Sequence, residues 1–69
     1  MMNEETFNNS VRKFLKKAGI TSQRDIEKHV DEALRRGDIK GNETFAASIV
    51  LEIPELGLKT RIEGDINLE

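Results

Sequence analysis

The chain has 69 residues, of which 36% are apolar, 35% charged and 4% aromatic, so it has room for one small domain, residues 1–69. It contains no cysteine, which excludes disulfides and thiolate metal sites, and its single histidine excludes the usual imidazole metal clusters. We therefore expect a domain that holds no metal and no cofactor and is stabilised by packing alone.

Nothing in the sequence indicates a membrane span or an export signal. The longest apolar run is Ile49–Leu51, far short of the roughly 18 residues that a transmembrane helix needs. The N-terminus carries Glu4 and Glu5 where a secretory signal would carry positive charge. We expect a cytoplasmic protein.

Charge is unevenly distributed along the chain, although the net charge is only −2. Residues 1–40 carry nine Lys or Arg and seven Asp or Glu, whereas residues 41–69 carry two and six. One run of bases has no acid within it: Arg12, Lys13, Lys16, Lys17 and Arg24. This basic run is the candidate surface for nucleic acid.

Residues 4–18 are predicted to form a helix, because their apolar residues recur at helical spacing: Phe7, Val11, Phe14, Leu15 and Ala18. Asn3 suits the N-cap, and Gly19 suits the left-handed residue that ends a helix, with Ile20 contacting Leu15. A helix end at this point would explain most of the basic run, because cations are favourable near the negative end of the helix dipole. The alternative explanation is a nucleic-acid phosphate or an acidic protein.

A second helix is predicted over residues 22–36. Ser22 followed by Asp25 resembles a capping box, and Gly37 supplies the stop. Asp31 precedes Arg35 by four residues, which is the favourable order for an ion pair. Only three residues separate the two helices, so the chain is expected to turn sharply between them.

From Thr44 onward the apolar period changes to two, which predicts strands over residues 44–53 and 58–67. Residues 54–57 suit a four-residue turn, so the strands are expected to pair antiparallel, with paired residue numbers that sum to 111. In that register Ile49 meets Ile62 on an apolar face.

Two details of this hairpin are less regular. The pair of Ala47 and Gly64 has little side chain, so we expect either a bulge or a helix side chain that fills the space. Ile39 is a candidate for a short extra bridge at one edge of the hairpin.

Together these segments predict an α+β fold of order ααββ, in which two N-terminal helices pack on the apolar face of a C-terminal antiparallel hairpin. The opposite face is charged on the second strand but carries Ala46, Ser48 and Val50 on the first. Unpaired strand edges favour association. These three residues are therefore the candidate surface for another protein or for a second copy of the chain.

His29 is the one candidate for acid–base chemistry, with Asp25 one turn earlier to orient it. The alternative is a histidine at the boundary of the apolar stripe, without a catalytic role. No Gly-x-Ser-x-Gly elbow accompanies it, and the glycines form no phosphate-binding fingerprint. We expect a non-catalytic protein-interaction module, with no catalytic, cofactor-binding or metal-binding residues.

Binding of nucleic acid is the alternative hypothesis. The string LKKAGITSQRDI is similar to the turn of a helix-turn-helix, but that motif favours a small residue at position 15 and apolar residues at 25 and 28. This chain has Leu15, Asp25 and Lys28 there. The helix-turn-helix reading therefore fails on spacing, and the basic run remains the only support for this alternative.

Four strings resemble a family of small bacterial proteins catalogued as a domain of unknown function: NEETF, SVRKFLKK, GITSQRDIEK and KGNE. The resemblance covers nearly the whole chain and implies a stand-alone cytoplasmic bacterial protein. It brings no activity and no site residues with it. We assign no functional role to Leu68 and Glu69.

Overall fold

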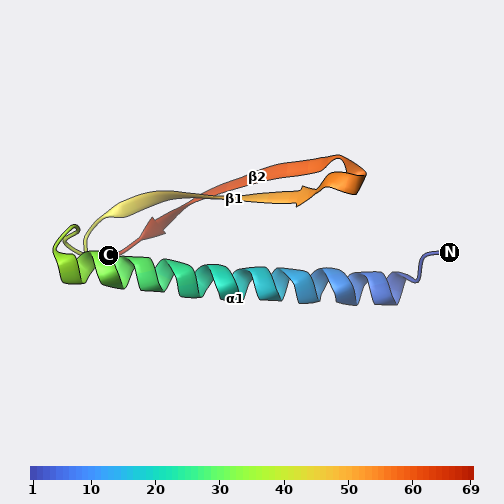
Figure 1. Ribbon diagram of the computed structural model, residues 1–69, viewed down its shortest axis with the longest axis horizontal. Coiled ribbons are helices and arrows are strands. Elements are labelled where there is room, and N and C mark those ends of the chain that lie inside the picture. The colour runs from blue at the N-terminus through green and yellow to red at the C-terminus, as the bar shows by residue number, and fades with distance from the viewer. The chain divides into compact units, whose positions relative to one another are not determined.

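The computed structural model describes residues 1–69 and contains one helix followed by one hairpin (Figure 1). Its elements are the helix α1 (Glu4–Arg36), the strand β1 (Thr44–Ile53), the short 3-10 helix η1 (Pro54–Leu56) and the strand β2 (Leu58–Asn67). The chain divides into two compact units, Met1–Arg36 and Gly37–Glu69. The predicted α+β class is confirmed, while packing of the helical segment on the hairpin stays a prediction.

The prediction of two helices is wrong, because α1 runs without interruption through residues 19–21. Gly19 is not among the glycines with positive φ, so it does not form a left-handed stop. A glycine inside a helix costs about 1 kcal/mol relative to alanine. A break would instead leave up to four N–H and four C=O groups without helical partners and would require a second nucleation. Continuing the helix is the less costly choice, and neither a Schellman contact nor a capping box forms there.

The start of α1 at Glu4 and its end at Arg36 coincide with the predicted start of the first helix and the predicted end of the second. The side-chain oxygen Oδ1 of Asn3 accepts a hydrogen bond from the Thr6 N–H at 3.1 Å, as expected of an N-cap. Gly37 follows the last helical residue with φ of 76°, in the left-handed region that ends helices. The predicted ion pair also forms, with Arg35 Nη2 at 3.1 Å from Asp31 Oδ2. No helix of the structure is both long and apolar enough to cross a membrane.

The hairpin follows the predicted register from end to end. Thr44 faces Asn67 and Ile53 faces Leu58, with every pair between them in step, so paired numbers sum to 111 throughout. The turn is built on Pro54 at the start of η1, and Gly57 ends it with φ of 65° and donates its N–H to the Pro54 carbonyl at 3.0 Å.

Neither a bulge nor an extra bridge forms in the hairpin, while the filling of the space at Ala47 and Gly64 by a helix side chain stays a prediction. Ala47 pairs directly with Gly64 in an unbroken ladder, so no bulge forms. Ile39 lies outside the two-stranded sheet, and the expected extra bridge is wrong. The reason is local: the backbone N–H groups of Lys40, Gly41 and Asn42 turn to the Glu43 side chain, and this turn separates Ile39 from the first strand pair.

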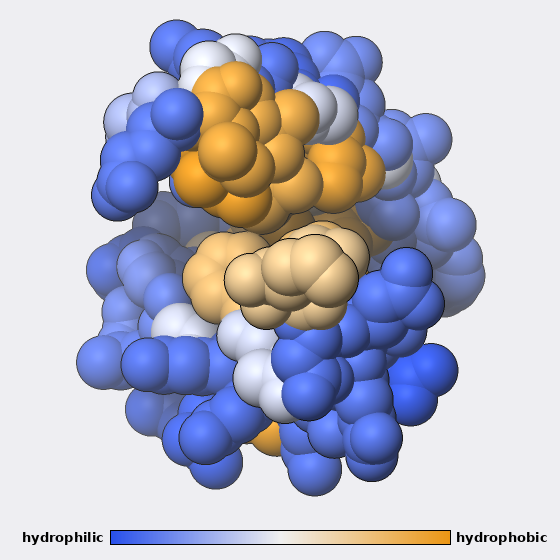
Figure 2. All heavy atoms as spheres, turned by 90° about the vertical axis from the view of Figure 1, so that its right-hand side faces the viewer, coloured by the Kyte–Doolittle hydropathy of each residue, from blue (hydrophilic) through white to orange (hydrophobic).

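No side chain of either unit is buried. Phe45 and Leu51 of the apolar hairpin face are half-buried, whereas Ile49 and Ile62 of the same face are 51% and 55% exposed. Apolar side chains consequently gather at the surface, as the orange spheres of Figure 2 show. Such exposed apolar surface is typical of proteins that bind a partner.

Candidate functional site

The free edge of β1 presents the backbone of the predicted partner surface. In an antiparallel ladder, directly opposed residues alternate between pairs that exchange hydrogen bonds and pairs that do not. The Leu68 N–H donates to the Glu43 carbonyl at 3.0 Å, which makes this a hydrogen-bonded pair just beyond the strand ends. Alternation from there points the N–H and C=O groups of Ala46, Ser48 and Val50 away from β2.

The side chains of these same three residues are small, uncharged and exposed. Val50 is 45% exposed, and Ala46 and Ser48 are exposed as well. From Thr44 to Leu51 the strand β1 carries no charge. This edge therefore offers unpaired backbone groups without charged side chains to protect them.

The opposite edge differs in charge. The residues of β2 whose backbone groups point outward by the same alternation are all charged up to position 65: Lys59, Arg61, Glu63 and Asp65. Charged side chains are the usual means by which proteins prevent edge-to-edge pairing. The hairpin thus has one protected edge and one unprotected edge.

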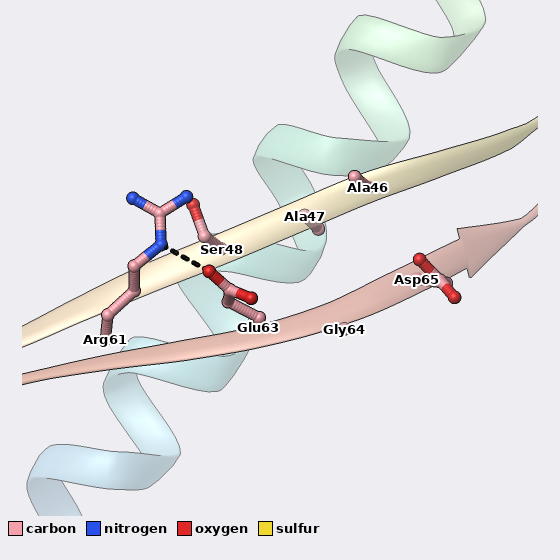
Figure 3. Close-up of a pocket in the computed structure, with 7 residues that line it drawn as sticks. All are labelled: Ala46, Ala47, Ser48, Arg61, Glu63, Gly64 and Asp65. Atoms are coloured by element: carbon pink, nitrogen blue, oxygen red, sulfur yellow. Dashed lines mark hydrogen bonds and ion pairs between the residues drawn. The ribbon is translucent and has the colours of Figure 1, made fainter.

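A hollow of about 370 Å3 lies over the middle of the hairpin, lined by Ala46, Ala47, Ser48, Arg61, Glu63, Gly64 and Asp65 (Figure 3). The small side chains of Ala46 and Ser48 leave the backbone of the Ala47 and Gly64 pair open on this face. On its rim Arg61 Nε donates to Glu63 Oε1 at 2.8 Å. The hollow includes two residues of the predicted partner surface but not Val50.

The basic run lies within α1, where Lys13, Lys17 and Arg24 are spaced by four and seven residues and so share one side of the helix. The expected explanation by a helix C-terminus is wrong, because α1 continues to Arg36. The like-charged pair of Lys13 and Lys17 therefore lies mid-helix, where it is unfavourable by a few tenths of a kcal/mol. The continuous helix also excludes a helix-turn-helix.

His29 does not contact the Asp25 carboxylate. Its Nδ1 lies 2.7 Å from the main-chain carbonyl oxygen of Asp25. A carbonyl only accepts hydrogen bonds, so Nδ1 donates. The structure places His29 on an exposed part of α1 without the orienting carboxylate that the general-base interpretation requires.

The loop before β1 contains a feature that sequence reasoning missed. The Glu43 carboxylate accepts hydrogen bonds from the backbone N–H groups of Lys40 at 2.8 Å, Gly41 at 2.9 Å and Asn42 at 3.2 Å. Hydrogen bonds from the Lys40 and Gly41 amides lower the pKa of Glu43 below its ordinary value of 4.5. The signal in the sequence was Gly41, because a glycine two residues before an acid permits such a turn. In the structure Gly41 has φ of 105°.

Leu68 is a second residue that sequence reasoning missed. Its N–H extends the ladder by one pair beyond the strands, and its side chain is half-buried. The apolar face continues to this residue, since it lies two positions after Ile66. That period of two was the available signal.

Comparisons with curated proteins and with solved structures find no similar protein. The model of one protein family matches residues 2–69, a range that includes Leu68 and Glu69. The four strings quoted above lie within this range. The chain belongs to the family of unknown function DUF6494.

Proposed function

We propose that this protein is a non-catalytic interaction module whose β1 edge accepts an extended strand of a partner protein. The observation that carries the proposal is the contrast between the two edges of the hairpin. Outward-facing residues of β2 are charged from Lys59 to Asp65, whereas on β1 Ala46, Ser48 and Val50 are uncharged and Glu52 at the strand's end is the only charged one. Strand addition at an open edge is a common mode of peptide recognition, with affinity from main-chain hydrogen bonds.

The surroundings of the β1 edge support the same function. An added strand would run beside the small side chains of Ala46 and Ser48, next to the hollow over the hairpin. The exposed Val50 offers apolar contact on the same face. The hollow has room for a side chain of the added strand, and the Arg61 and Glu63 pair on its rim offers polar contacts.

A proline at Ser48 tests the proposal, because it removes an outward-facing N–H without removing a hydrogen bond between β1 and β2. The matched control is Glu63→Pro, since Glu63 lies directly opposite Ser48 and its N–H points outward from β2. Each variant and the unaltered protein would be immobilised and exposed to a lysate of the native host.

Proteins that bind through the β1 edge should be retained by the unaltered chain and by Glu63→Pro, and lost with Ser48→Pro. A second variant, Ser48→Lys, places a charge on the β1 edge opposite Glu63 and should have the same effect. Equal retention by all four proteins would overturn the proposal.

Nucleic-acid binding is a second candidate, favoured by the mid-helix position of the basic run. Arg12, Lys13, Lys16, Lys17 and Arg24 have no helix terminus nearby to offset their repulsion. Titration with labelled DNA and RNA at several salt concentrations tests it, because phosphate contacts release counterions and give a steep salt dependence. Absence of DNA and RNA binding at low salt would contradict nucleic-acid binding by this protein.

A further inference from the structure

The free edge of β1 can be extended only by a strand from another molecule. The sheet has two strands, β1 and β2, and the other long element of the chain is the helix α1. The backbone groups of a helix interior are bonded within the helix, so α1 cannot continue a ladder. A strand that bonds to the outward-facing groups of Ala46, Ser48 and Val50 must therefore come from outside the chain.

Symmetry limits how the β1 edges of two copies can meet. A two-fold axis perpendicular to the sheet makes the two β1 strands antiparallel and keeps the apolar faces of both hairpins on the same side. A parallel pair would need an axis along the strands, which turns one hairpin over and joins an apolar face to a polar one. Only residues with outward-facing groups can exchange hydrogen bonds, so both members of each bonded pair must have even numbers.

We propose that the strand accepted by the β1 edge is β1 of a second copy of the chain, paired antiparallel about a two-fold axis at Ser48. The inference rests on the function proposed for the β1 edge and names its partner. Paired residue numbers sum to 96, so that Ser48 faces Ser48 of the other copy and Ala46 faces Val50 of the other copy. The two hairpins then form one four-stranded sheet, in which β2 of each copy lies outermost.

Charges on the polar face complement each other in this arrangement. Asp65 lies opposite Ala46 on β2, and Arg61 lies opposite Val50. Because Ala46 of one copy faces Val50 of the other, Asp65 falls in the same row of the four-stranded sheet as Arg61 of the other copy. This match of opposite charges occurs twice about the axis, and the residues between them are uncharged.

Acidic residues exclude the neighbouring registers. In the proposed register Glu52 faces the uncharged Thr44, and the ladder covers β1 from Thr44 to Glu52. A shift by two residues in one direction puts Glu52 in the row of Asp65 of the other copy. The opposite shift moves Glu52 past the start of β1 and shortens the ladder. Glu63 recurs in the central row, but Arg61 balances it within each copy, with Nε at 2.8 Å from Glu63 Oε1.

The apolar face supplies a second and independent match. Ile49 of one copy faces Ala47 of the other, at a non-hydrogen-bonded position where side chains lie closest. Ala47 pairs with Gly64 within its own hairpin, so the large Ile49 adjoins the pair with the least side chain. Ile49 is 51% exposed in the single chain. Phe45 faces Leu51 in the same ladder, which continues the apolar face across all four strands.

Prolines on the two edges test the proposal. The dimer dissociation constant of the full chain would be measured by sedimentation equilibrium. Ser48→Pro should weaken the dimer at least about a hundredfold, because both hydrogen bonds at the axis lose their N–H and leave carbonyls unpaired. Glu63→Pro is the matched control, since Glu63 lies opposite Ser48 and its N–H points outward from the other edge. It should leave the dissociation constant within about threefold of the original. Circular dichroism would show that each variant keeps its fold.

A pair of charges tests the register without proline. Positions 46 and 50 lie about 13 Å apart along one strand, so their side chains do not meet within a chain, whereas across the axis they are directly opposed. Val50→Glu should weaken the dimer about tenfold, because its carboxylate enters the row of Asp65 of the other copy. The double variant Ala46→Lys with Val50→Glu keeps the original net charge. It should dimerise about tenfold more tightly than Val50→Glu alone, since two opposite-charge pairs form across the axis.

The outcomes separate this inference from the function on which it rests. A dimer that is lost with Ser48→Pro and kept with Glu63→Pro supports both. A mass near 7.8 kDa at every concentration would overturn the inference, and capture of a different protein that Ser48→Pro abolishes would then leave the function of the β1 edge standing. A dimer that Ser48→Pro leaves intact, or a double variant no tighter than Val50→Glu, would also overturn it, because the copies would then meet at another surface or in another register.

Discussion

Gly19 and Gly37 lie eighteen residues apart in the same segment and differ in backbone conformation. Gly37 has φ of 76° and ends α1, whereas Gly19 lacks a positive φ and continues it. A Cβ added at either position would meet no atom within 4 Å. The difference between the two glycines is therefore one of backbone conformation and not of space.

Gly19→Ala should stabilise the helix by about 1 kcal/mol, because alanine loses less backbone entropy than glycine inside a helix. Gly37→Ala should destabilise it by about 1 kcal/mol, because a side chain is strained at positive φ. Thermal unfolding followed by circular dichroism measures both. A loss of stability in Gly19→Ala would mean that the helix is broken at residue 19 after all.

The same pair of glycines shows what the sequence can and cannot predict. Both are followed by plausible stop signals, and a local pattern does not distinguish a glycine that ends a helix from one that the helix passes through. What decides is the cost of the alternative, since a break at Gly19 would expose helix ends on both sides. The apolar residues at helical spacing on both sides of Gly19, such as Leu15, Ala18 and Ile26, carried this information, but it emerges only when the whole segment is considered at once.

Every strand pair of the hairpin was predictable, because several independent features of the sequence determine the same register. The turn at Pro54, the position of Glu52 opposite Lys59, and the apolar alternation through Ile49 each require the same register. A slip by one residue would have placed every side chain on the wrong face.

By the alternation set at the Glu43 and Leu68 pair, Ala46, Ser48 and Val50 are among the β1 residues whose backbone groups point outward, together with Thr44 and Glu52. Position within the strand predicts the face to which each side chain points. The direction of the backbone groups follows only from the hydrogen-bonded pair of Glu43 and Leu68, which the structure supplies.

The N-terminal cap gives a second prediction. Asn3 supplies the only side-chain hydrogen bond to the first turn of α1, through the Thr6 N–H. Asn3→Ala should cost about 1 kcal/mol of helix stability, because that N–H loses its partner. Asn3→Asp should retain the stability, since aspartate caps equally well and favours the positive end of the helix dipole. Loss of stability in both variants would contradict the assigned cap.

The Glu43 carboxylate should make the loop before β1 sensitive to acid. Its pKa is lowered in the folded chain by the Lys40 and Gly41 amides, so the charged form is the one that folding favours. The stabilisation is fully present above the ordinary pKa of 4.5 and is lost as pH falls through the lowered value. The amide resonances of Lys40 and Gly41 should move with that titration in an NMR experiment. In Glu43→Gln these shifts should be absent, and shifts that persist would assign the titration to another group.

The open position at Gly64 gives the last prediction. Gly64 pairs with Ala47 in a regular part of the ladder, lacks a positive φ, and would place a Cβ in open space. Gly64→Val should therefore stabilise the hairpin by about 1 kcal/mol, since valine suits a strand and loses less entropy on folding. Gly57→Val is the contrasting variant, because Gly57 has φ of 65° and should not accept a branched side chain. Thermal unfolding of both measures the difference, and a destabilised Gly64→Val would indicate that residue 64 needs the freedom of glycine for a conformation other than the regular strand.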